Sequence, residues 1–65
     1  MLDTKVKIDG LVVVVIVDMW IQGGDLYVTA QNEMSGGKKD FQVIGLNDWV
    51  EMETGEEVEV REEEV

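Results

Sequence analysis

The chain has 65 residues, of which 15 are acidic and 5 basic, giving a net charge of −10, and it contains neither cysteine nor histidine. A chain of this length forms one domain and buries only about 60% of the surface that its unfolded form exposes, so its stability margin is small. The absence of Cys and His excludes disulfides and ordinary zinc, haem or iron–sulfur sites, and we expect no cofactor and no metal. The negative charge repels nucleic-acid phosphates and anionic lipids, which predicts a basic protein partner, no direct nucleic-acid binding and no membrane binding.

The first residues, Met1 to Lys5, lack the basic start and the cleavage-site pattern of a signal peptide. The longest apolar run, Leu11–Val17, has seven residues, far short of the roughly 20 that a membrane-spanning helix needs. We therefore expect a cytoplasmic protein.

Short strands separated by turn residues are predicted along the first half of the chain. The segment Lys5–Ile8 precedes Asp9-Gly10, a strong two-residue hairpin signal, and a long valine-rich strand follows at Leu11–Ile21. The glycine-rich segment Gln22–Asp25 predicts a second turn, and Leu26–Asn32 alternates apolar and polar residues as a half-buried strand does.

The second half of the sequence predicts shorter strands and loops. A polar loop is expected at Glu33–Asp40, and a short helical turn at Leu46–Trp49, because Asn and Asp readily bond their own backbone. Like charges and the chain end favour a frayed tail over residues 62–65, which leaves residues 1–61 as a single barrel domain. The remaining strands are predicted at Phe41–Ile44, Val50–Glu53 and Glu56–Arg61.

Strands this short and closely spaced predict an all-β fold, a small five- or six-stranded barrel of antiparallel hairpins, because closure removes the exposed edges of a small sheet. The layout resembles the SH3-like barrels. Val6-Lys7-Ile8-Asp9-Gly10, Trp20 near a hairpin and the later Gly-Gly-Lys loop are similar to the small archaeal chromatin proteins. That resemblance implies the fold alone, because those proteins are basic and bind DNA whereas this chain is acidic.

The valine-rich strand is apolar on both faces. Its odd-numbered positions are all apolar, and its even-numbered positions include Val12, Val14 and Ile16. A small barrel has one interior, so we expect the even-numbered face to be covered from outside. Three covers are compatible with the sequence: the chain's own Val58 and Val60, a second copy in a homo-oligomer, or a groove-binding partner. Self-association through Val12, Val14 and Ile16 makes an assembly subunit the alternative function.

Acidic residues concentrate near the C-terminus, with eight acidic residues and one basic residue from Trp49 onward, a charge of −7 in 17 residues. A chain reversal at Thr54–Glu56 would pair Met52 with Val58 and leave four carboxylates on the other face. They are Glu51 opposite Glu59 and Glu53 opposite Glu57. Such a row is typical of a solvated, aggregation-resistant edge, but it could also bind a protein by imitating nucleic-acid phosphates. Cation binding is a third reading, although no Asp-x-Asp-x-Asp-Gly loop is present.

Catalytic residue patterns are missing from the sequence. The single serine, Ser35, lies in a glycine-rich loop with no candidate base, and the Gly-Gly segments lack the spacing of a phosphate loop. We therefore expect that the chain is not an enzyme.

Four aromatic residues offer either core packing or recognition. Trp20 and Tyr27 flank one predicted hairpin and could form a patch whose acidic rim suits an Arg- or Lys-rich peptide, as in the Tudor-like members of the SH3-like group. The sequence thus predicts a non-enzymatic protein-binding module that engages a basic partner through Trp20, Tyr27 and the four glutamates. Its most specific form is a DNA-mimic inhibitor, such as a phage or mobile-element protein that blocks a host nuclease or repressor.

Overall fold

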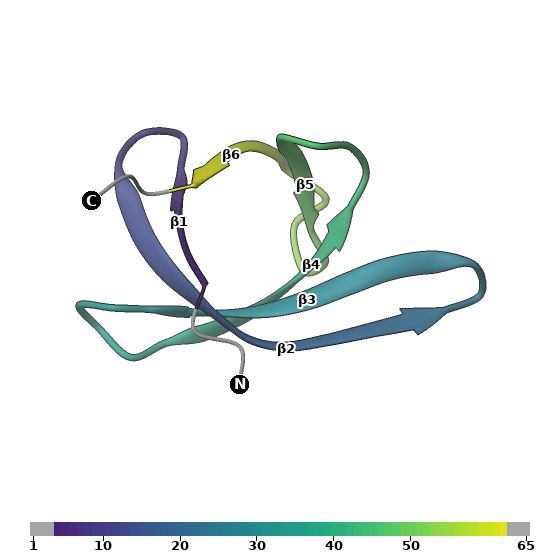
Figure 1. Ribbon diagram of the computed structural model, residues 1–65, viewed down its shortest axis with the longest axis horizontal. Helices are drawn as coiled ribbons and strands as arrows, with labels where there is room; N and C mark the ends of the chain where they lie inside the picture. The colour runs from purple at the N-terminus through teal and green to yellow at the C-terminus, as the bar shows by residue number, and fades with distance from the viewer. Residues whose placement is uncertain (1–3, 63–65) are drawn as a thin grey trace.

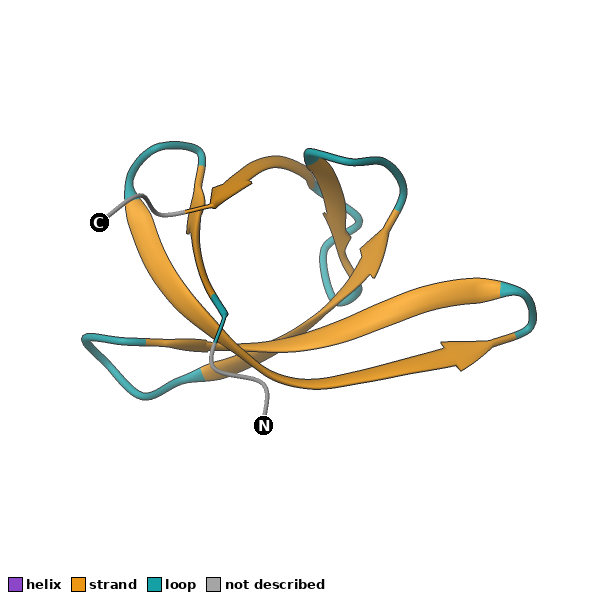
Figure 2. Ribbon diagram, in the orientation of Figure 1, coloured by secondary structure: helices purple, strands orange, loops and turns teal. Residues whose placement is uncertain are grey.

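The computed structural model describes residues 4–62, which form one closed antiparallel barrel in the order β1-β2-β3-β4-β5-β6 (Figure 1). These residues form only strands and loops (Figure 2). They therefore contain no helix long and apolar enough to cross a membrane. The prediction of a small all-β barrel is confirmed. The strands are β1 (Lys5–Ile8), β2 (Val12–Gln22), β3 (Asp25–Asn32), β4 (Lys38–Val43), β5 (Asp48–Glu51) and β6 (Glu57–Glu62).

Two tight turns set the first three strands. Asp9 and Gly10 have φ angles of 53° and 69°, and the Leu11 N–H donates to the Ile8 carbonyl at 3.0 Å. Two successive positive φ angles match the right-handed twist of paired strands, which is why Asp-Gly is favoured there. Gly23 and Gly24 repeat this geometry between β2 and β3, with φ angles of 59° and 84°. Both predicted hairpins are therefore present.

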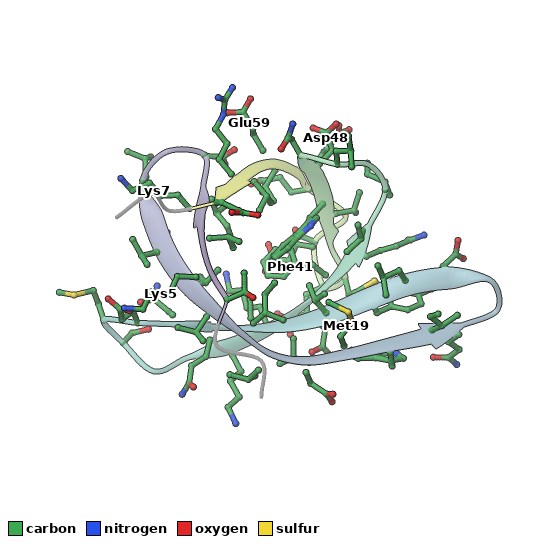
Figure 3. All side chains as sticks on the ribbon, viewed as in Figure 1. Lys5, Lys7, Met19, Phe41, Asp48 and Glu59 are labelled. Carbon is green, nitrogen blue, oxygen red and sulfur yellow. The ribbon has the colours of Figure 1, made fainter. Side chains whose placement is uncertain are left out.

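The core fills the inside of the barrel. Phe41 and Trp49 pack against each other there, with ring centroids 5.4 Å apart, and Figure 3 shows Phe41 pointing into the barrel. Of the two readings that the sequence left open for the four aromatic residues, core packing therefore applies to Phe41 and Trp49. The other buried apolar residues come from four strands, and they are Val6, Val14, Ile16, Val28, Ala30, Val58 and Val60.

The strand β2 is longer than the barrel requires and changes its inward face part of the way along. Its pairing with β3 runs from Val14 opposite Asn32 to Gln22 opposite Asp25, with a bulge between Ile16 and Asp18. The extra residue of a bulge reverses the alternation of the strand. Even-numbered residues therefore point inward before the bulge, and odd-numbered residues point inward after it. Beyond the bulge, β2 and β3 extend past the barrel as an arm, here defined as residues 18–27 (Figure 1).

The prediction that Val12, Val14 and Ile16 form an outer face is wrong. Val14 and Ile16 are 4% and 7% exposed, inside the barrel with Val58 and Val60. Val12, 38% exposed, lies at the barrel end. Closure of β6 onto β1 turns this side of β2 inward, which matches the alternative in which the chain's own C-terminal strand covers it. Self-association through Val14 and Ile16 would require them to leave the core.

Several predicted boundaries shift in the second half of the chain. The structure has no helical turn at residues 46–49, because the bend there leads directly into β5 at Asp48. The strand β4 begins at Lys38, three residues earlier than predicted, since the loop before it is shorter. Glu62 belongs to β6 and pairs with Val6, so the prediction that a frayed tail begins at residue 62 is wrong. Residues 63–65 of that tail lie outside the described residues.

Candidate binding surface

Trp20 and Tyr27 stack on the outer side of the arm. They are cross-strand partners on β2 and β3, with ring centroids 5.6 Å apart and planes inclined by 17°. Trp20 faces outward because the bulge reversed the alternation of β2; without it, this ring would point to the inner side of the sheet. Both side chains are half-buried. The predicted pairing of these two aromatics into one patch is thus present in the structure.

A shallow hollow lies beside the aromatic pair. It is lined by Trp20 and Tyr27, by the carboxylates of Asp25 and Asp40, and by Met52, with Gln22 and Gly23 at the arm's turn. Asp40 reaches this side of the sheet from β4, where its Oδ1 accepts a hydrogen bond of 2.7 Å from the Thr29 hydroxyl. The hollow thus combines aromatic faces with two acidic groups, an arrangement that suits a cationic side chain.

The acidic row predicted in the C-terminal hairpin is not formed. Trp49 pairs with Val58 and Asp48 with Glu59, so the register differs from the predicted pairing of Met52 with Val58. Glu57 and Glu59 are exposed on the outside of β6, and Glu53 is exposed in the turn before it. The outer face of β5 and β6 therefore carries Asp48, Glu57 and Glu59, and Arg61 interrupts the negative charge, with Nε 3.4 Å from Glu59 Oε1.

Glu51, predicted to bind a partner, points to the inner side of the barrel wall. It is 9% exposed and is the one buried charged residue among residues 4–62. Lys39 Nζ lies 3.2 Å from its Oε1, and the Thr54 hydroxyl donates to its Oε2 at 3.0 Å. The bond to Lys39, and then the bond to Thr54, lower the pKa of this carboxyl. A carboxylate held in this way ties β4 to the β5–β6 turn, and we assign it a structural role.

A second hollow opens at the barrel end where the β1–β2, β3–β4 and β5–β6 turns meet. Core side chains such as Val14 and Phe41 form its floor, and the Lys39–Glu51 pair lies at its rim. The floor is the barrel core itself, and the opposite charges at the rim satisfy each other. Among the described residues, no group of three Asp or Glu side chains is placed to hold a metal ion.

No protein-family model matches this chain, and neither a curated protein nor a solved structure is significantly similar to it.

Besides Gln22 and Gly23 at the turn, three residues of the hollow were not predicted as binding residues from the sequence, namely Asp25, Asp40 and Met52. Asp40 was assigned to a polar loop, whereas it lies in β4 opposite Thr29. Continuing the alternation of Phe41–Ile44 backward by one residue would have placed Asp40 on the outer face. Met52 was expected to face Val58 in the core, but the observed register leaves it half exposed.

Proposed function

We propose that this chain is a non-enzymatic protein-binding module that engages an arginine- or lysine-rich segment of a basic partner. The stacked pair of Trp20 and Tyr27 beside the Asp25 and Asp40 carboxylates carries this proposal. A guanidinium or ammonium group within about 6 Å of an aromatic centroid is attracted by the ring, and neighbouring carboxylates add charge-assisted hydrogen bonds. The net charge of −10 steers such a partner toward the molecule and disfavours acidic competitors.

The nature of the partner follows from charge. Nucleic-acid-binding proteins present the most extensive basic surfaces, so an inhibitor that occupies such a surface is the specific form of the proposal. The exposed Asp48, Glu57 and Glu59 on the β5–β6 face would supply the long-range attraction. We also propose membership of the SH3-like group of barrels, on the basis that consecutive strands pair throughout and the last strand pairs with the first.

Two double variants with the same change in charge test the proposal. Asp25→Asn with Asp40→Asn removes two charges at the hollow, and Glu57→Gln with Glu59→Gln removes two charges from β6. The probe is a fluorescent peptide of alternating arginine and glycine, and the measurement is its affinity by fluorescence anisotropy. We expect the first variant to lose at least about tenfold more affinity than the second, because its carboxylates contact the bound cation.

The opposite ranking, or equal losses, would show that diffuse charge and not the hollow binds the peptide. Trp20→Leu provides a further check, since it removes the aromatic ring but keeps an apolar side chain and every charge. We expect it to weaken binding, and circular dichroism confirms in each case that the barrel is intact. Unchanged affinity in both Trp20→Leu and the Asp25, Asp40 double variant overturns the proposal.

A further inference from the structure

One edge of β2 has no neighbouring strand among the described residues. The strand β1 pairs with β2 only from Val12 to Val15, and the Thr4 carbonyl then accepts from the Ile16 N–H at 3.0 Å. The strand β3, by contrast, pairs with β2 as far as Gln22. We call residues Val17–Gln22 the arm edge, since residues 4–62 provide them with a partner strand on one side only, as Figure 1 shows for the part of β2 that leaves the barrel.

The hairpin geometry determines which backbone groups of the arm edge face outward. Gln22 and Asp25 flank a two-residue turn and therefore exchange hydrogen bonds, as do Trp20 and Tyr27 two positions along. Met19 and Ile21, which alternate with them, direct their N–H and C=O groups away from β3. Independent support comes from Met19, whose N–H donates at 2.8 Å to the Asp18 carboxylate and so does not bond to β3.

The two faces of the arm edge differ in chemistry. The outer face carries Asp18 and Trp20, next to the hollow. The inner face carries Met19 and Ile21, which are 45% and 75% exposed, on the part of β2 that extends past the barrel (Figure 1). A strand laid against this edge would therefore meet carboxylates and an aromatic ring on one side and apolar side chains on the other.

We propose that the partner's basic segment binds the arm edge as an added β-strand, with arginine or lysine on its outer face alternating with apolar residues on its inner face. This inference rests on the proposed function and specifies its partner. Strand addition takes its affinity from backbone hydrogen bonds and its specificity from alternate side chains. The cationic side chains would lie over Trp20 and beside Asp18, and the apolar ones against Met19 and Ile21.

Charge selects a basic segment over a second copy of the chain. Two copies, each with a charge of −10, repel each other, and both would bring Asp18 to the shared edge. The Met19 N–H already donates to the Asp18 carboxylate, so an incoming strand must break this hydrogen bond before it can bond to Met19. A cationic side chain on the incoming strand gives the displaced carboxylate a new partner, whereas an acidic strand does not. Asp18 thus favours the binding of basic strands over acidic ones at this edge.

The variant Ile21→Pro tests strand addition without altering charge. Proline removes the outward N–H at position 21, and an edge position whose N–H does not bond to the sheet tolerates it. Ile21→Thr is the matched control, since it loses a similar amount of apolar surface but keeps the N–H. The probe is a peptide of alternating arginine and valine. We expect Ile21→Pro to weaken its binding at least about tenfold more than Ile21→Thr, with the Trp20–Tyr27 stacking unchanged by near-ultraviolet circular dichroism.

Amide hydrogen exchange with the same peptide gives a second readout in the unmodified protein. We expect exchange at the Ile21 N–H to slow on binding while the Tyr27 N–H, already bonded within the hairpin, changes little. Peptide binding with equal affinity for Ile21→Pro and Ile21→Thr, and no protection at Ile21, overturns strand addition but leaves the proposed function in place. Failure of every arginine-rich peptide to bind overturns the proposed function itself.

Discussion

The barrel and the arm are built from the same strands but bury them to very different degrees. Before the bulge, β2 contributes Val14 and Ile16 to the core, and after it, Met19 and Ile21 continue the same side of the sheet yet stay exposed. The difference lies in closure, because β6 returns to β1 and encloses the first part of β2 in the barrel, whereas the arm extends past the barrel (Figure 1). One strand therefore contributes to the core at one end, and at the other end it presents the surface that we propose binds a partner.

The largest contrast between the two regions is expected in stability. Phe41→Ala removes a ring that packs against Trp49 in the core, and truncations of this kind cost about 3–5 kcal/mol. Since a domain of this size has a total stability of roughly 5 kcal/mol, we expect the variant to be largely unfolded at 25 °C. Circular dichroism with urea titration measures this. A cooperative transition near that of the wild type would contradict the assignment of Phe41 to the core.

The second contrast concerns association. Asp18→Val removes the carboxylate that accepts from the Met19 N–H at the arm edge. The remaining strand is apolar and uncharged and has free backbone groups, and such an edge favours edge-to-edge pairing. We expect a larger apparent mass than that of the wild type at equal concentration, measured by sedimentation velocity. Glu59→Val is the control, since it makes the same change on β6, a strand paired on both sides. If both variants sediment alike, lost charge and not the open edge controls association.

The third contrast concerns pH. Because the folded-state pKa of Glu51 is lowered from its ordinary value of 4.5, its stabilising contribution is fully present above that value and is lost as pH falls through the folded-state pKa. We expect the wild type to exceed Glu51→Gln in urea midpoint at pH 7, and the gap to close below about pH 4. The difference between the two urea midpoints at each pH cancels the effect of the other carboxylates, which both proteins share. A gap that does not change with pH would contradict the ion pair with Lys39.

The smallest effect is expected for the arm's apolar side chains. Ile21 is 75% exposed, so Ile21→Thr should change the free energy of unfolding by no more than about 0.5 kcal/mol. Chemical denaturation of this variant beside the wild type measures the difference. A loss of about 2 kcal/mol or more would mean that the arm is packed into the core and is not a free surface.

The sequence predicted the strands well where turn chemistry is local. Asp9-Gly10 and Gly23-Gly24 define their hairpins by backbone preference alone, and both are found as expected. The bulge in β2 escaped prediction because an apolar run offers the same pattern in either alternation. Only closure of the barrel determines that Val14 and Ile16 face inward.

The predicted register of the C-terminal hairpin was wrong for a related reason. Val50 and Met52 formed an apolar face in the predicted register, whereas the structure buries the larger ring of Trp49 opposite Val58. Burying an indole ring removes more apolar surface from water than burying Met52 does, and it brings Glu51 inward on the same side. That orientation is acceptable only because Lys39, from another strand, reaches the carboxylate. Spacing within one hairpin cannot reveal such a partner.

Chemical-shift mapping of the ¹⁵N-labelled protein with the arginine–valine peptide tests the central claim most directly. The account predicts that the largest changes appear at the Trp20 indole and at backbone amides of the arm edge, with the barrel resonances little affected. Changes concentrated instead on Glu57 and Glu59 of β6 would contradict it, because binding would then follow the general negative charge and not the surface built by the arm.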